Sequence, residues 1–342
     1  MNDGYYNFDG EGPDGRQPGN ETAPLPENAV DVMRVSADEV REALADEVMQ
    51  GKRRRSRGWT IVFVVALCVF IVSVGALGTI GFSYFQGQQK YGDIATHAEV
   101  SALTDDTGEP DSATSWDKLE ESVHVDWDAL RKANPDTVAW LHVPKTVISY
   151  PVVQGDDNEY YLTRDFDGEA GWLANYGAIF MDYQNKPDWS DQSYFIYGHH
   201  MNDGSMFADL VGLEDQARFD ECRTIYLLSP KGNMRLRTFA LVHCAPEEEI
   251  VYTKFKDAKE MQEYIQDKID RSLVHPSDVP SAKSIKKLFA FATCDNVSWG
   301  RYVLYAYVVN ASDDSLKGEV GIGGSNEGSK EFVDQIEEKE TK

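Results

Sequence analysis

The sequence predicts a mainly β fold that is preceded by one membrane-spanning helix. Three observations lead to this prediction: about eight short runs rich in β-branched and aromatic residues, turn signals between those runs, and one long uncharged apolar segment. Short strands in this number are typical of a closed β-barrel or a β-sandwich. Without the low-complexity ends and the apolar segment, roughly 190 of the 342 residues remain, which is about one ordinary domain.

The apolar segment, residues 58–85, has no charged side chain and is long enough to cross about 30 Å of hydrocarbon as a helix. A cleaved signal peptide would lie at the extreme N-terminus, whereas this segment follows an acidic leader, so we expect it to stay in the mature protein. A basic cluster precedes it, and only Lys90 lies near its other end. The positive-inside rule therefore predicts a single-pass protein of the cell membrane with a cytoplasmic N-terminus and an extracellular folded domain. The basic cluster consists of Lys52, Arg53, Arg54, Arg55 and Arg57.

The overall charge argues against a nucleic-acid-binding protein. The formal net charge is −25 at pH 7, and a field of this sign opposes binding to phosphates. The basic cluster alone could be read as a nucleic-acid patch, but its position beside the apolar segment favours a role in membrane orientation. We therefore expect the membrane, and no nucleic acid, among the partners.

Composition divides the chain into five regions. The two ends are rich in Gly and charge and cannot bury enough apolar area to offset their chain entropy. Ser36 and Glu39 fit a capping box at the start of a short amphipathic helix. The regions are a disordered acidic cytoplasmic tail with this juxtamembrane helix (1–57), the transmembrane helix (58–85), an extracellular stalk (86–115), the folded domain (116–312) and a disordered tail (313–342).

Two helices are predicted in the folded domain besides the strands. One covers residues 125–133 and ends before Asn134 and Pro135, and the other, residues 257–274, lies between the sixth and seventh strands. The predicted strands are Ala139–Val143, Ile148–Val153, Ala178–Asp182, Ser193–Tyr197, Thr224–Ser229, Arg235–His243, Lys287–Thr293 and Tyr302–Asn310.

Three cysteines follow the apolar segment, and an odd number in an oxidising compartment leaves at least one thiol to be explained. Cys222 and Cys244 flank a hairpin, but register counting places Cys222 opposite a residue near position 241, so a disulfide between them is possible and not favoured. Cys294 closes an apolar strand, and a new strand begins at Arg301. If those strands pair, the two residues are cross-strand neighbours, and the guanidinium favours the thiolate and can support a developing oxyanion.

A cysteine nucleophile also needs a histidine that gives a proton to the leaving amine. His199 and His200 follow a strand at Gly198 and precede a turn, so they are expected at the rim of the fold, where only one of them can face the thiol. Spacing alone does not choose between them. Adjacent histidines are not at metal-ligand spacing, so we expect no metal and no cofactor. The other candidates are His97, His124, His142, His243 and His275.

Several motifs together resemble the class B sortases, across residues 120–310. They are Trp-Leu-His-Val-Pro (140–144), Tyr-Pro-Val-Val-Gln (150–154), Asp-Asn-Glu-Tyr-Tyr-Leu (157–162), Tyr-Gly-His-His-Met (197–201), Asp-Gly-Ser-Met-Phe (203–207) and Thr-Cys (293–294) with Arg301. The resemblance implies an eight-stranded sortase-type β-barrel with an N-terminal helix and a helix between the sixth and seventh strands. One departure is Ala290, where many sortases have a threonine; Thr293 is present.

The resemblance implies a membrane-anchored cysteine transpeptidase. Carried over by position, it makes Cys294 the nucleophile, His199 rather than His200 the general acid and later base, and Arg301 the residue that orients substrate and supports the oxyanion. The implied substrates are secreted proteins with a C-terminal sorting signal, and the acceptor is an amine of a cell-wall precursor or a pilin. Neither the sorting motif, the acceptor, nor the choice between surface-protein anchoring and pilus assembly can be read from this chain.

Two other functions fit parts of the sequence. A Cys-His cell-wall hydrolase or protease would use the same thiolate with water as acceptor, although papain-like enzymes usually place the cysteine before the histidine. A non-catalytic surface receptor would carry the thiol merely buried. The first predicts hydrolysis that is insensitive to amines, and the second predicts that loss of Cys294 leaves function intact.

Overall fold

The computed structural model of the chain describes residues 36–101, 103, 121, 123–170, 177–294 and 300–318, and the side chains of all of these except 52–56. The chain forms two compact units, which meet within one helix at Val74 and Gly75. The predicted tails at 1–35 and 319–342 lie outside the described residues.

Helix α1 (Ala37–Ala95) contains both the predicted juxtamembrane helix and the apolar segment. The predicted capping box is confirmed, because the Glu39 N–H donates to Ser36 Oγ at 3.1 Å and the Ser36 N–H donates to Glu39 Oε2 at 3.0 Å. Large apolar side chains of this helix, such as Trp59 and Phe63, are exposed. In the described part of the chain, one helix is long and apolar enough to cross a membrane, by length and composition.

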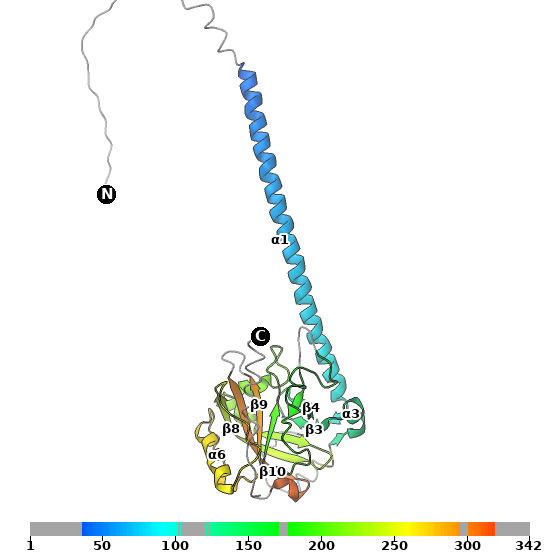
Figure 1. Cartoon of the computed structure of the whole chain (residues 1–342), viewed down its shortest axis with the longest axis vertical. Helices are drawn as coiled ribbons and strands as arrows, with labels where there is room; N and C mark the ends of the chain where they lie inside the picture. The colour runs from blue at the N-terminus through cyan, green and yellow to red at the C-terminus, as the bar shows by residue number, and fades with distance from the viewer. Residues whose placement is uncertain are drawn as a thin grey trace, which may run out of the picture. The chain divides into compact units, whose positions relative to one another are not determined.

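Eight strands close into a barrel in the order β10-β8-β7-β3-β4-β5-β6-β9, as the resemblance implies (Figure 1). Each predicted strand is present, with ends that differ from the prediction by at most two residues. The observed strands are β3 (Thr137–His142), β4 (Ser149–Val153), β5 (Ile179–Met181), β6 (Ser193–Tyr197), β7 (Thr224–Leu228), β8 (Met234–Cys244), β9 (Leu288–Cys294) and β10 (Arg301–Ala311).

The barrel is closed by β9, which lies between β6 and β10. It runs parallel to β6 and antiparallel to β10. All five residues of β6 and the first six of β9 are buried, because these strands are covered on both faces. Helix α4 (Ala208–Gly212) contacts the outer side of β9 and β10. The ends of β6, β9 and β10 are therefore fixed by close packing.

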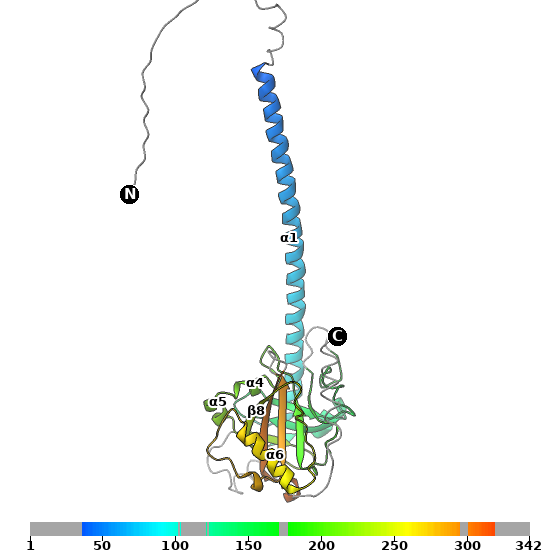
Figure 2. The same ribbon diagram turned by 60° about the vertical axis from the view of Figure 1, so that its left-hand side comes forward.

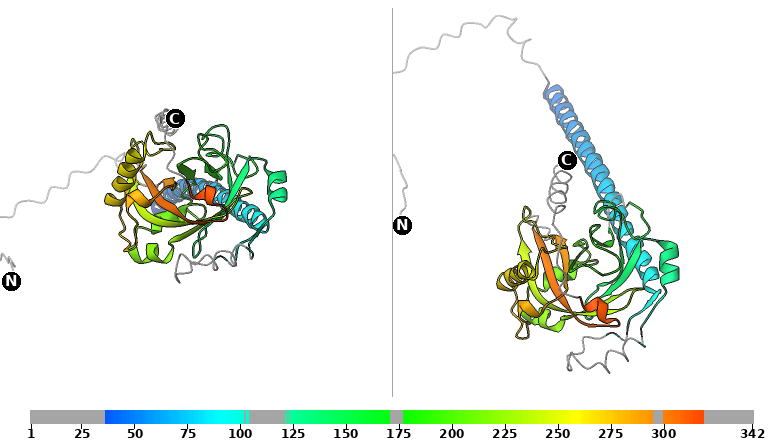
Figure 3. Two further views of the ribbon diagram at one scale, coloured as in Figure 1. Left: turned by 90° about the horizontal axis from the view of Figure 1, so that it is seen from below. Right: turned by 60° about the horizontal axis from the view of Figure 1, so that its bottom comes forward.

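The remaining helices lie around the barrel, with α3 (Trp127–Ala133) and α6 (Ala258–Asp270) on opposite sides (Figures 1 and 3). Helix α6 lies along the barrel wall near β8 (Figure 2). Its predicted apolar face is confirmed, since Met261 and Ile265 are buried. It ends four residues before the predicted end at 274, because the Leu273 N–H donates to Leu241 O of β8 at 2.8 Å and the backbone leaves the helix. Short helices α5 (Gln216–Glu221), η1 (Ala282–Ser284) and η2 (Asp314–Lys317) complete the domain.

The predicted stalk at 86–115 differs from the structure in its first part. Helix α1 continues to Ala95, and its Tyr91 and Ile94 side chains are buried in the domain core. A short strand, β1 (Ala98–Glu99), then pairs with β2 (His124–Val125). The folded domain thus begins before the predicted start at Trp116, because apolar residues three apart on a helix share one face and gain free energy from burial. Residues 104–115 lie outside the described part.

Candidate active site

The two buried cysteines, Cys222 and Cys244, do not form a disulfide. Thr224 pairs with Arg237, so this register places Cys222 opposite position 239 and far along the strand from Cys244. The expected position near 241 was two residues off, because the hairpin closes with Leu227 opposite Met234. Cys294 is the cysteine of the barrel that is partly exposed.

Cys294 and Arg301 are direct cross-strand partners, as predicted. The arginine is buried to 7% exposure, and its Nη1 donates to Pro246 O at 2.8 Å. On its other side Arg301 pairs with Cys244 of β8. Cross-strand partners have Cβ atoms about 5 Å apart, so the Arg301 side chain leaves the backbone next to that of Cys294. The hydrogen bond to Pro246 O, just after β8, helps to fix the guanidinium group.

His199 reaches the same end of the barrel from the other side of β9. Tyr197 pairs with Ala292, and the Gly198 N–H donates to Ala292 O at 3.2 Å. Two residues further along, His199 follows the end of β6 and Cys294 is the last residue of β9; neighbouring strands lie about 4.8 Å apart. The three residues predicted for the site therefore lie at the same end of three adjacent strands, with His199 just past β6, Cys294 on β9 in the middle and Arg301 on β10.

The imidazole of His199 is held by backbone groups. Its Nε2 lies 2.6 Å from Leu162 O, and since a carbonyl only accepts, the neutral ring carries its proton on Nε2 and leaves Nδ1 as an acceptor. Gly177, at φ +58°, packs against the same ring; a Cβ there would lie 2.5 Å from His199 Cδ2. Burial lowers the pKa of His199 below its usual 6.5, and the bond to Leu162 O opposes this in part.

His200 points to a different group. Its Nδ1 lies 3.2 Å from the backbone oxygen of Cys294. The backbone of His200 also pairs with that of Met206 in an isolated antiparallel β-bridge. Sequence reasoning singled out both histidines and missed Leu162 and Gly177. Those two act through a carbonyl oxygen and through the lack of a side chain, and neither leaves a chemical signature in the sequence. In the described part of the chain no group of three or more His, Cys, Asp or Glu side chains could hold a metal ion.

We predict that acidification below about pH 6.5 destabilises the fold. Burial lowers the pKa of both His142 and His199. Near pH 6.5 these histidines take up protons in the unfolded chain but stay neutral in the folded chain. The free energy of unfolding therefore falls as the pH decreases through that value, by about 1.4 kcal/mol per unit of pKa difference. Thermal unfolding of the full chain in detergent at pH 7.5 and 5.5 measures this. His142→Asn should weaken the dependence, and an unchanged slope would contradict it.

Comparison with known proteins places this geometry in a family. The sortase domain model matches residues 141–311. Sortase B of Listeria monocytogenes serovar 1/2a is 33% identical over 183 residues, which are 53% of this chain and 72% of that protein. Sortase B of Bacillus anthracis in complex with AAEK1 superimposes with a TM-score of 0.54 at 26% identity, over 67% of this chain and 99% of that one. The Staphylococcus aureus sortase B–substrate complex gives 0.50 at 25% identity, over 54% and 84%.

These matches agree with the motifs and with the closed barrel of eight strands. They also remove the alternative of a non-catalytic receptor, since the family consists of cysteine transpeptidases. The chain therefore belongs to the sortase family and is a cysteine transpeptidase of class B.

Proposed function

We propose that residues 58–85 anchor this transpeptidase in the cell membrane, with the N-terminus in the cytoplasm and the barrel outside the cell. The length and composition of α1 and the basic residues before the apolar segment support this topology. The enzyme then meets secreted proteins after their export. We propose that it cleaves their C-terminal sorting signal and transfers the new acyl group to an amine of a cell-wall precursor or a pilin.

Cys294 is the proposed nucleophile, His199 the proposed acid and base, and Arg301 the proposed oxyanion support. The observation that carries this assignment is the placement of Cys294 on the middle one of three paired strands, with Arg301 as its direct partner. A nearby cation favours the thiolate over the thiol. Pro246 O accepts from one guanidinium nitrogen, and arginine has five N–H donors, so the group can be held in place and still meet a substrate oxygen.

The reaction proceeds in two steps. The Cys294 thiol gives its proton to His199 Nδ1, and the thiolate attacks the carbonyl carbon of a Thr–Gly or Thr–Asn type bond. The C–N bond breaks as the imidazolium returns the proton to the leaving amine, and a thioester remains on Cys294. An acceptor amine then attacks the thioester, His199 takes the amine proton, and the thiolate leaves. A new amide replaces the old one, so no ATP is needed.

Burial suits His199 to this proton transfer. Because the buried ring has a lowered pKa, its protonated form is a stronger acid than free imidazolium and releases the proton readily to a leaving amine. Leu162 O holds the Nε2 proton throughout, so Nδ1 is the atom that exchanges protons. Arg301 stabilises the negative oxygen of each tetrahedral intermediate.

Intact cells that lack other sortases and express the full chain provide the test. A fluorescent sorting-signal peptide and a membrane-impermeant biotinylated amine are added outside. The proposal predicts a product that carries both labels in the medium, and no such product with Cys294→Ala. Cleavage that yields only a free acid at every amine concentration would instead indicate a hydrolase. Product that forms only after lysis would contradict the proposed topology.

A further inference from the structure

The last turns of α1 contact the described residues of the segment that holds His199, namely 162–170 and Gly177. Tyr91 Oη donates to Gly177 O at 2.7 Å and accepts from the Phe166 N–H at 3.3 Å. The Tyr91 side chain is buried at 8% exposure, and its ring packs edge-on against Tyr150 with centroids 5.5 Å apart. A single hydroxyl thus joins two backbone groups that are eleven residues apart in sequence.

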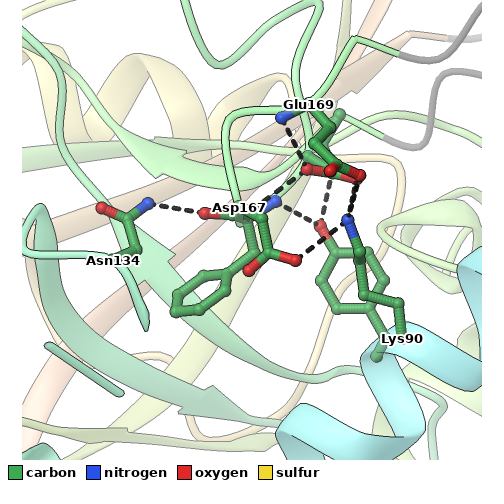
Figure 4. A network of polar contacts seen from close by, with 8 residues as sticks. Lys90, Asn134, Asp167 and Glu169 are labelled. Carbon is green, nitrogen blue, oxygen red and sulfur yellow. Dashed lines mark hydrogen bonds and ion pairs between the residues drawn. The ribbon is translucent and has the colours of Figure 1, made fainter. Parts of the chain in front are cut away.

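Neighbouring contacts hold the same segment. Lys90 Nζ lies 2.8 Å from Asp165, 2.9 Å from Asp167 and 2.9 Å from Glu169, and Figure 4 shows the ammonium group among these carboxylates. From the other side, Asn134 Nδ2 donates to Phe166 O at 2.6 Å. The ion pairs are partly exposed, so each contributes little to stability. Their effect is to keep the segment against the end of α1.

The two walls of the His199 ring belong to this segment. Gly177 lies so close to the ring that there is no room for a Cβ, and Leu162 O takes the Nε2 proton at its other end. The Ala178 N–H donates to Tyr161 O at 3.2 Å, which ties the two walls together. A small shift of the Gly177 backbone would move its α-carbon toward or away from the imidazole. The Tyr91 hydroxyl donates to the Gly177 carbonyl oxygen and so opposes this shift.

We propose that Tyr91 is a positioning residue for the catalytic imidazole, an inference that rests on the role of His199 proposed above. Tyr91 acts through Gly177 and does not touch the substrate. It lies on α1, in the turns that follow the apolar segment 58–85, so the end of this helix contributes to the active site. Lys90 and its three carboxylates support Tyr91 by keeping the segment docked.

The test compares two phenylalanine variants of the full chain in detergent. Tyr91→Phe keeps the buried ring and removes the hydroxyl that holds Gly177. Tyr194→Phe is the matched control, because its hydroxyl is also buried and bonds a backbone N–H, that of Asp191 at 2.7 Å, at the start of β6 and away from the site. Measured are kcat for amine transfer, the thermal midpoint, and the pH dependence of iodoacetamide labelling at Cys294, located by peptide mass.

Tyr91→Phe should lower kcat on the order of tenfold, since misplacement of a catalytic group lowers the rate steeply. It should also shift the pH midpoint of Cys294 labelling, because the thiol titrates against the displaced imidazole. Tyr194→Phe should change the thermal midpoint by a similar amount and leave both other readouts unchanged. Equal kcat values and equal pH midpoints in the two variants would overturn the positioning role.

Two further measurements separate this inference from the function on which it rests. If the wild-type chain forms no amine-joined product, or if His199→Asn keeps full activity, the proposed function fails and takes the inference with it. If the wild type is active and needs His199 while Tyr91→Phe behaves as Tyr194→Phe does, only the positioning role is wrong.

Discussion

Replacing Cys294 with alanine is expected to lower transpeptidation by at least about 10⁴-fold, because a thioester needs a thiol and the other two cysteines of the barrel domain, Cys222 and Cys244, are buried. Cys294→Ser should be nearly as inactive, since a serine hydroxyl is a much weaker acid and nucleophile than a thiol. Neither change removes a large apolar group, so both variants should unfold near the wild-type temperature. Initial rates of amine transfer and thermal midpoints in detergent are the measurements.

Cys244→Ala provides the matched control for this prediction. Cys244 is the other cross-strand neighbour of Arg301, but burial raises the pKa of its thiol to about 11, so it is protonated at neutral pH. The variant should keep its activity within a few-fold and lose some stability, since a buried side chain is shortened. If Cys244→Ala lost activity while Cys294→Ala kept it, the nucleophile would be on β8 and the assignment to Cys294 would be wrong.

Replacing His199 with asparagine is the second change with a large expected effect, roughly 10²- to 10⁴-fold in kcat. The shorter asparagine amide takes the place of the near edge of the ring, so the bond from Nε2 to Leu162 O is lost together with proton exchange. The pH–rate profile of the remaining activity should also lose the transition that comes from titration of the imidazole. Rates between pH 5.5 and 9 for variant and wild type would show this.

His200→Asn tests whether the adjacent ring could be the acid instead. His200 contacts the backbone oxygen of Cys294, which takes no part in proton transfer, so its loss should cost less than about tenfold. A larger loss in His200→Asn than in His199→Asn would reverse the assignment and would make His200 the residue that exchanges protons with Cys294 and the substrate.

Much of the barrel could be read from the sequence, because strands leave a local pattern. The run Leu288–Cys294 followed by a new strand at Arg301 implied a hairpin, and the hairpin implied that Cys294 and Arg301 are partners. Helix α6 was predicted from apolar residues such as Met261 and Ile265, and its last residues were misjudged because the bond to Leu241 is tertiary. Local pattern does not report where a backbone is pulled away from its helix.

The region after the apolar segment was the least predictable. Its small polar residues resemble a spacer, yet Tyr91 and Ile94 are buried in the core, because the barrel offers an apolar surface at that place. Composition indicates how much apolar surface the side chains of a segment contribute. It does not say whether another part of the chain can cover that area.

The amino-acid sequence by itself determined that α1 contains an apolar stretch long enough to cross a membrane, the order of the strands along the chain and the chemistry of a thiol, an imidazole and a guanidinium. Only the tertiary structure decided that β9 lies between β6 and β10, that Leu162 and Gly177 enclose the His199 ring, and that α1 reaches this enclosure. The physical reason is that strand pairing across the barrel and backbone hydrogen bonds join residues far apart in sequence, through groups that every residue carries.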